Sequence, residues 1–124
     1  MTDEQWIELG RRVVACKHWR WMPGMLARYE GGAWHRVTEA DSFGLPTRVR
    51  PPNPRQAWPD LRDPATVGCL LALVRKAWDD PFALVDYDRK HWGIFVEARD
   101  TVWVCTDKTE AAALVAALKE AAND

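Results

Sequence analysis

The sequence predicts an α+β fold in which a small antiparallel sheet, made of a hairpin and a three-stranded meander, packs with three helices. Three observations support this prediction. Apolar residues repeat at helical spacing in three separate segments, short runs rich in valine, isoleucine, phenylalanine and tryptophan lie between those segments, and polar turn residues divide the runs. A chain of 124 residues, 48% of them apolar, is long enough to bury a core without disulfides. We therefore expect a single domain over residues 1–124.

The first half of the chain is expected to contain a helix, a hairpin and a loop. A helix is predicted from Thr2 to about Lys17, because capping and acidic residues begin it. A Glu-Gly-Gly turn between two short runs of strand-forming residues predicts a hairpin over residues 25–37. Residues 39–59 contain five prolines, which predicts a loop with room for a short edge strand at 47–50.

A central helix is predicted over residues 64–78. Asp63 stands at the N-cap and Pro64 at the first helical position, where the missing N–H of proline costs nothing. Apolar or small residues occupy nearly every side of this segment, which is typical of a helix buried on more than one face. The residues expected in the core are Val67, Leu70, Leu71 and Val74.

The last part of the chain predicts three strands and a closing helix. The strands are expected at Phe82–Asp86, His91–Ala98 and Thr101–Thr106, and polar turns join them into a meander. The helix is expected over Thr109–Ala122. Its alanine-rich face carries small side chains, which allow close packing on the meander.

Composition indicates a cytoplasmic protein that does not enter a membrane. The longest apolar stretch, Val67–Val74, is far shorter than the roughly 20 residues that cross a bilayer. The first residues lack the basic start and apolar run of a signal peptide. Cys16, Cys69 and Cys105 are odd in number and widely spaced, which indicates reduced thiols rather than a disulfide framework.

Charge is distributed unevenly along the chain, whose net charge is −1. Residues 11–55 carry nine Lys or Arg against three acids, and the segments on either side are acidic overall. This split predicts either one basic and one acidic face, suited to a charged partner, or charges spread around the folded surface. The order of residues leaves both interpretations open.

Three stretches, taken in order, resemble one group of proteins: Trp19–Met25, Pro59–Arg75 and Thr109–Leu118. Together they resemble short uncharacterised proteins encoded by bacteriophages and prophages. The resemblance implies a phage origin and action in the cytoplasm of a bacterial host cell. It transfers no catalytic residues to this chain.

Signatures of catalysis and of metal binding are weak. Cys16 and His18 form the only close pair of metal-ligand types, and the chain has neither CxxC nor HxxxH spacing. Ser42 is the single serine, and no GxSxG, phosphate-binding loop or GxGxxG motif is present. We therefore expect no metal, no cofactor and no catalytic residues.

Eight tryptophans are the unusual feature of the composition. Those on regular elements are expected in the core: Trp6, Trp78, Trp92 and Trp103. The other four lie near several arginines, in residues 19–58. Arginine with tryptophan is typical of protein-binding hot spots, and the same pair stacks on bases and contacts phosphates. The alternative is that these tryptophans cover the sheet while arginines extend over them. The candidate binding residues are Trp21, Arg36, Arg48, Arg50, Arg55 and Trp58.

Two classes of function follow from this segment. The first hypothesis is a phage-encoded interaction protein that binds and modulates or inhibits a bacterial host protein, such as a defence component. The alternative is a module that binds a nucleotide or nucleic acid through residues 19–58; a small enzyme is a distant third. A flat apolar patch would favour a protein partner, and a concave pocket with converging arginines would favour a phosphate ligand. The oligomeric state is not predicted.

Overall fold

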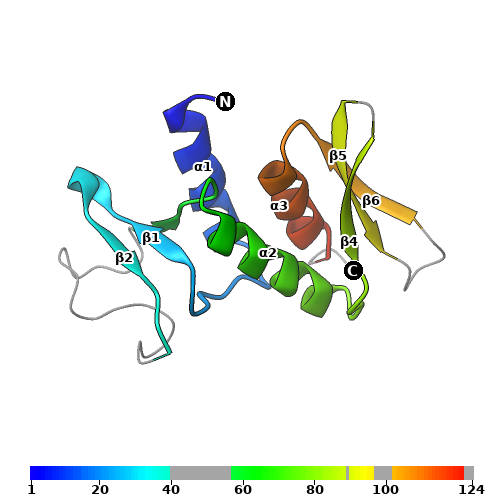
Figure 1. The fold of residues 1–124 in the computed structure, drawn as a ribbon, viewed down its shortest axis with the longest axis horizontal. Coiled ribbons are helices and arrows are strands. Elements are labelled where there is room, and N and C mark those ends of the chain that lie inside the picture. Colours follow the sequence, from blue (N-terminus) through cyan, green and yellow to red (C-terminus); the bar gives the residue numbers. More distant parts are fainter. Residues whose placement is uncertain (40–56, 89, 97–101, 122–124) are drawn as a thin grey trace. The chain divides into compact units, whose positions relative to one another are not determined.

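The computed structural model describes residues 1–39, 57–88, 90–96 and 102–121. These residues form three α-helices and two three-stranded antiparallel sheets, which confirms the predicted α+β class (Figure 1). The hairpin and the meander both form, but they belong to separate sheets rather than to one. Contacts divide the chain into two compact units. The first comprises residues 1–15 and 20–69, and the second comprises residues 16–19 and 70–124.

Helix α1 (Asp3–Val14) opens the first unit. Thr2 caps it reciprocally: its hydroxyl accepts a hydrogen bond from the Gln5 backbone N–H at 3.2 Å, and the Gln5 side chain accepts one from the Thr2 N–H at 2.7 Å. The predicted end at Lys17 is wrong, because the helix ends at Val14. The residues that follow, 16–19, belong to the second compact unit.

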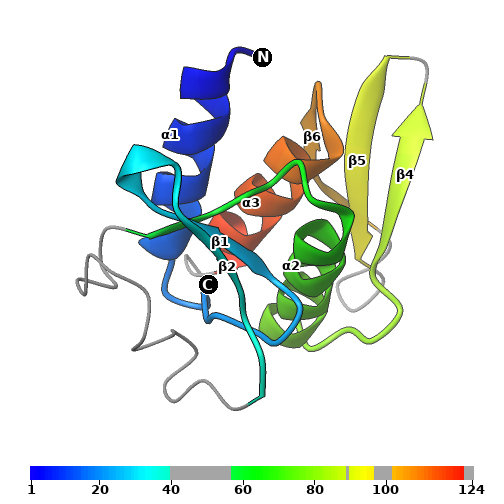
Figure 2. The same cartoon turned by 60° about the vertical axis from the view of Figure 1, so that its left-hand side comes forward.

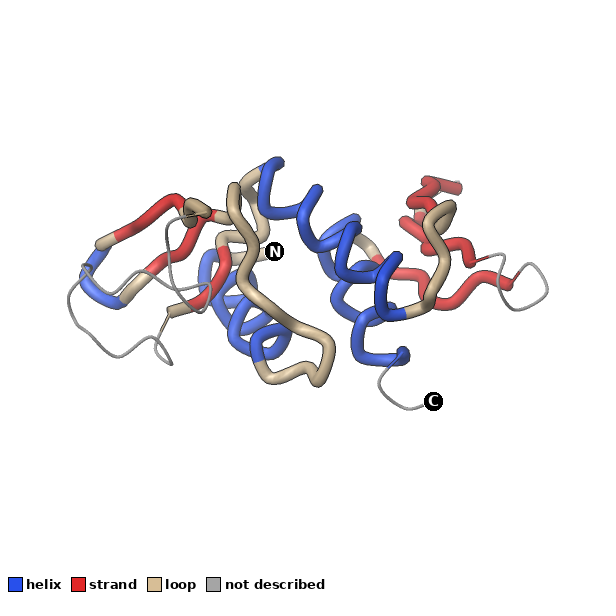
Figure 3. The backbone as a smooth tube through the Cα atoms, turned by 90° about the horizontal axis from the view of Figure 1, so that it is seen from below, coloured by secondary structure: helices blue, strands red, loops and turns tan. Residues whose placement is uncertain are grey.

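The sheet of the first unit has the strand order β2-β1-β3. Strands β1 (Leu26–Arg28) and β2 (Trp34–Arg36) form the predicted hairpin, joined by the 3₁₀ turn η1 (Glu30–Gly32) (Figure 3). Gly31 and Gly32 have φ angles of 84° and 90°, which only glycine adopts without strain. The Glu-Gly-Gly sequence therefore encodes this turn directly.

Strand β3 (Trp58–Pro59) corrects the expectation that this stretch is loop. It pairs with the free side of β1, with Arg28 opposite Trp58 and Ala27 opposite Pro59. Proline is tolerated here because β3 is an edge strand. The short strand expected at residues 47–50 lies outside the described residues.

Helix α2 (Pro64–Ala77) starts where the sequence predicts, with the carboxylate of Asp63 accepting a hydrogen bond from the Thr66 N–H at 3.0 Å. Its burial differs from the prediction. Leu70, Leu73 and Val74 are buried, whereas Val67 and Leu71 are only half-buried. The small residues Ala65, Gly68 and Ala72 are exposed, so the helix buries one face and not its whole circumference.

The second unit contains the predicted meander, with the strand order β4-β5-β6. Its strands are β4 (Leu84–Asp88), β5 (His91–Val96) and β6 (Val102–Asp107). Helix α3 (Glu110–Ala121) lies against β5 and β6 (Figures 1 and 2). Its alanine-rich face is buried, as predicted, which brings the helix close to the sheet.

The tryptophans expected in the core differ in burial. Trp78 is buried, and its indole N–H donates a hydrogen bond to the Ala117 carbonyl at 2.9 Å, which confirms its predicted place. Trp6 and Trp92 are only half-buried. An indole that keeps part of its surface in contact with solvent is available to a ligand, and Trp6 lies in the site described next.

Candidate functional site

A cleft of about 430 Å³ opens in the first unit; we call it the Trp58 cleft. Three parts of that unit form its walls: the first two turns of α1, the η1 turn of the hairpin, and the segment from β3 to the start of α2. Its lining residues are Asp3, Trp6, Ile7, Arg28–Gly32 and Trp58–Arg62. The cleft therefore exists only because three distant stretches of the chain meet.

Three aromatic residues, Trp6, Tyr29 and Trp58, form the aromatic wall of the cleft, and two of them are buried. Trp58 is 9% exposed and Tyr29 is 2% exposed, so both belong to the core as well as to the lining. The guanidinium of Arg11 lies 4.9 Å from the centroid of the Trp58 ring, within the range of a cation–π interaction. This is the arrangement in which an arginine extends over a buried tryptophan.

Close packing of α1 on β3 sets the position of Trp58. A Cβ atom at Gly10 would lie 2.8 Å from the carbonyl oxygen of Pro59 and 3.4 Å from the Trp58 side chain. Only glycine allows this approach without a shift of the backbone. The absence of a side chain at Gly10 thus allows α1 to pack directly against β3.

Ion pairs surround the cleft and balance its charge. The pairs are Arg11–Glu30 at 3.0 Å, Arg28–Asp60 at 3.0 Å, Arg62–Asp3 at 2.7 Å and Arg62–Asp60 at 3.7 Å. The Asp60 side chain is mostly buried and pairs with both Arg28 and Arg62. The side chains of Asp3 and Glu30 are largely exposed. Each arginine of the cleft therefore already faces a carboxylate.

Arg36, a predicted binding residue, supports the start of α2. Its guanidinium donates two hydrogen bonds to the Asp63 carboxylate, at 2.6 and 3.1 Å, and one to the Gly24 carbonyl at 2.9 Å. The bond from Arg36, together with those from Thr66, holds the pKa of Asp63 below its ordinary value. The charge of Arg36 is thus compensated within the fold.

The other predicted binding residues fall in three groups. Trp58 lies in the cleft, although in a strand and in the core. Trp21 is partly buried and packs against the cluster of Ala27, Tyr29 and Ala57. The remaining three, Arg48, Arg50 and Arg55, lie outside the described residues.

Sequence reasoning missed most of the cleft. The sequence predicts Trp6 in the core and assigns no binding role to Asp3 or Asp60, although all three line the cleft. Asp3 does lie in the first turn of α1, and Asp60 accepts a hydrogen bond from the Arg62 N–H at 3.0 Å within a turn. These local roles account for Asp3 and Asp60 by themselves, so no signal in the sequence indicates that both also line the cleft.

The thiols of Cys16 and Cys69 are poor candidates for nucleophiles. Burial raises the pKa of Cys16 and of Cys69, which favours the protonated thiol at neutral pH. Within the described part of the chain, no group of three His, Cys, Asp or Glu side chains is arranged to hold a metal ion. Among the same residues, no helix has the length and apolar character needed to span a bilayer.

The chain gives no significant match to protein-family models, to curated proteins or to solved structures. Its chemistry must therefore be argued from the site itself. An aromatic wall beside a balanced rim of charges suits a ligand that has both apolar and charged groups, as a peptide segment does. A phosphate would meet three carboxylates as well as the arginines.

Proposed function

We propose that this chain is an interaction protein that binds a segment of a partner protein in the Trp58 cleft. The observation that supports the proposal best is the combination of an aromatic wall, formed by Trp6, Tyr29 and Trp58, with a rim of paired charges. Tryptophan, tyrosine and arginine are the residue types enriched in protein-binding hot spots.

The exposed pairs at the rim suit exchange with a partner. The Arg62 side chain is 48% exposed and that of Asp3 is 84% exposed. An ion pair this open to solvent contributes little to stability, so a partner's charge replaces one member at low cost. The half-buried side chains of Trp6 and Ile7, beside the buried Trp58, supply the apolar contact area, and the rim determines the orientation of the bound segment.

A protein partner is favoured over a nucleic acid by the balance of charge. Nucleic-acid sites attract phosphates through uncompensated lysine and arginine side chains. In the cleft, Asp3, Glu30 and Asp60 face the arginines directly. The net attraction for a phosphate group is correspondingly small.

The resemblance to phage and prophage proteins supports a narrower form of the proposal. In that form the partner is a bacterial host protein whose activity the bound chain modulates or inhibits, with a defence component as one example. Binding takes place in the cytoplasm of the host cell, and it requires no cofactor and no catalytic group.

Site-specific photocrosslinking tests the proposal. A benzoylphenylalanine replaces Asp3, which lines the cleft, and in a matched protein it replaces Glu8, an exposed acid on the same helix that does not line the cleft. Each protein is illuminated in a bacterial lysate, and the adducts are identified by mass spectrometry. We expect a discrete protein adduct from position 3 and none from position 8.

Other adducts would change the conclusion. A nucleic-acid adduct from position 3, lost steeply as salt is raised, would favour the phosphate-binding alternative. Equal labelling from positions 3 and 8, or none from position 3, would show that the Trp58 cleft is not a binding site.

A further inference from the structure

The second unit carries an exposed apolar patch that the Trp58 cleft does not explain. Among the described residues, five large hydrophobic side chains are exposed, and three of them lie within residues 82–87. Phe82 is 74% exposed, Leu84 is 44% exposed and Tyr87 is 53% exposed. Their concentration on and beside one strand, β4, separates them from the scattered apolar residues of an ordinary surface.

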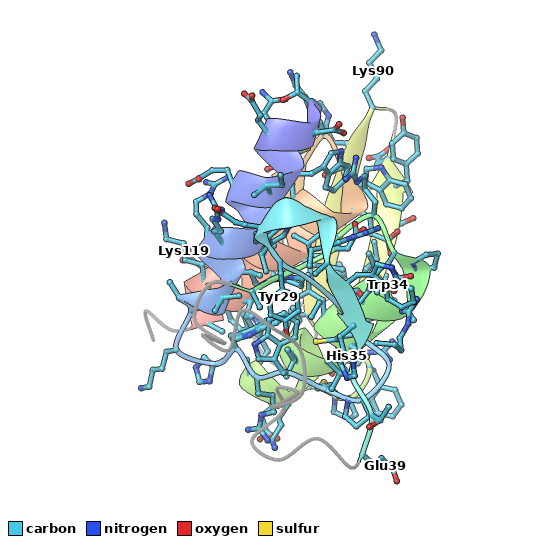
Figure 4. All side chains as sticks on the ribbon, turned by 90° about the vertical axis from the view of Figure 1, so that its left-hand side faces the viewer. Tyr29, Trp34, His35, Glu39, Lys90 and Lys119 are labelled. Carbon is cyan, nitrogen blue, oxygen red and sulfur yellow. The ribbon has the colours of Figure 1, made fainter. Side chains whose placement is uncertain are left out.

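Strand β4 is an edge strand. In the described part of the chain it is hydrogen-bonded to β5 on one side and to no strand on the other. Its register with β5 runs from Leu84 opposite Phe95 to Asp88 opposite His91, where a short turn carrying Lys90 closes the hairpin (Figure 4). An edge of this kind presents backbone groups that can pair with another strand.

One hydrogen bond shows which backbone groups face outward. The Tyr87 N–H donates to the carboxylate of Asp86 at 2.8 Å, and so it points away from β5. Backbone groups alternate sides along an antiparallel strand. The N–H and C=O groups of Val85 and Tyr87 therefore face the outer edge, and those of Leu84, Asp86 and Asp88 face β5.

Two candidates could add a strand at the outer edge of β4: a second copy of this chain, or an extended segment of another protein. The charges on β4 distinguish between them. Asp86 and Asp88 are both exposed on β4. Antiparallel pairing with a second copy, centred on the strand, would bring Asp86 against its own equivalent, and like charges directly opposite are destabilising. A strand with lysine or arginine at those positions would instead meet complementary charge.

We infer that the outer edge of β4 accepts a basic, extended segment of a partner protein as an additional strand. The carbonyls of that segment replace the Asp86 carboxylate on the Tyr87 N–H, and its cations pair with the released carboxylate of Asp86 and with Asp88. Leu84 shares a face with these two acids, so the methylene stem of a neighbouring cationic side chain covers it. The apolar side chains of the segment lie on the other face, where they meet Tyr87, whose ring lies 5.0 Å from that of Trp92.

A pair of synthetic peptides tests this inference on the full chain. One peptide alternates valine with lysine, and the control alternates valine with glutamate at the same length. Binding is followed by NMR of the ¹⁵N-labelled protein and by amide hydrogen exchange. We expect the valine–lysine peptide to shift the amide signals of residues 84–88 and to slow exchange at Val85 and Tyr87, and we expect the glutamate peptide to do neither.

Two sets of variants separate strand addition from a general electrostatic attraction between the peptide and the protein. Val85→Pro removes an outward N–H that β5 does not use, so the fold should persist while the shifts disappear. Asp86→Asn with Asp88→Asn should weaken the valine–lysine peptide by about fivefold, because two exposed pairs are lost. Asp79→Asn, an exposed acid outside β4, is the matched control and should leave the affinity unchanged.

Several results would overturn the inference. These are equal shifts with both peptides, shifts outside β4, or unchanged binding after the double asparagine change. Dimerisation of the free protein that Val85→Pro abolishes would show that the edge binds a second copy instead. None of these measurements involves the Trp58 cleft, so failure here leaves the crosslinking result at position 3 intact.

Discussion

The network around Asp63 gives the sharpest test of how this sequence holds its first unit together. The Asp63 carboxylate caps α2, pairs with Arg36 and accepts a hydrogen bond from the Thr66 hydroxyl at 2.9 Å. Thr66 is fully buried, and its hydroxyl in turn accepts a hydrogen bond from the Leu26 N–H at 2.9 Å. Asp63 and Thr66 together thus join the start of the helix to both strands of the hairpin.

Two substitutions separate the contributions of this carboxylate. Asp63→Asn removes the charge but keeps a side chain that caps helices equally well. Because the Arg36 side chain is 43% exposed, solvent screens the pair, and we assign it about 1 kcal/mol. Asp63→Ala also removes the cap, at about 1 kcal/mol, and the acceptor of the buried Thr66 hydroxyl, at about 1 kcal/mol.

The expected losses in the free energy of unfolding are therefore about 1 kcal/mol for the asparagine variant and about 3 kcal/mol for the alanine variant. For a chain of 124 residues these correspond to roughly 4 °C and 12 °C in Tm. Urea unfolding at pH 7 and thermal unfolding followed by circular dichroism measure both quantities. Equal losses for the two variants would show that Asp63 does not act as the cap.

The dependence of the free energy of unfolding on acid pH provides a second test of the Asp63–Arg36 pair. The pKa of Asp63 is lowered in the folded protein, mainly by Arg36, so its contribution is present above the unfolded pKa. That contribution is lost as the pH falls through the folded pKa, below the ordinary value of 3.8. The stability difference between the native protein and Asp63→Asn should therefore shrink below that pH. A difference that stays constant into acid would refute the role of the charge.

Four further substitutions test the packing, each by urea unfolding. Gly10→Ala should destabilise the protein by about 1–3 kcal/mol, because its Cβ would meet the Pro59 carbonyl, and this cost should exceed the preference of alanine for helices. A stabilised variant would mean that α1 does not pack closely on β3. Leu70→Ala should lower the free energy of unfolding by about 2–5 kcal/mol and Leu71→Ala by less than half as much, since of the two only Leu70 is fully buried. Equal losses would show that another face of α2 is the buried one. Trp34→Ala should stay within about 0.5 kcal/mol of the native protein, because the side chain is 62% exposed, and a larger loss would show that it packs against the fold.

Local signals in the sequence were sufficient for the start of each helix and for the hairpin turn. Asp63 followed by Pro64 predicted the N-terminus of α2, and the Glu-Gly-Gly turn predicted the hairpin. These features depend on hydrogen bonds and dihedral angles within a few residues, so the chain encodes them where they occur. The α+β class followed from the same signals.

The candidate site was not predictable in the same way. Trp58 was identified as a binding residue, but its neighbours Asp3 and Trp6 lie more than fifty residues away along the chain. Nothing in the local pattern around these residues indicates that they meet. Arg36 was chosen for its charge, and its partner Asp63 became apparent only when the hairpin and α2 came together.

The sequence by itself determined which segments are helices, which segments form the hairpin and the meander, and where the helices begin. Tertiary structure decided the rest: the pairing of β3 with β1, the single buried face of α2, the division of the strands into two sheets, and the outward edge of β4. The physical reason is the separation along the chain between the residues that interact. Capping and turn formation involve neighbouring residues, whereas burial and charge pairing depend on which distant side chains exclude water from one another.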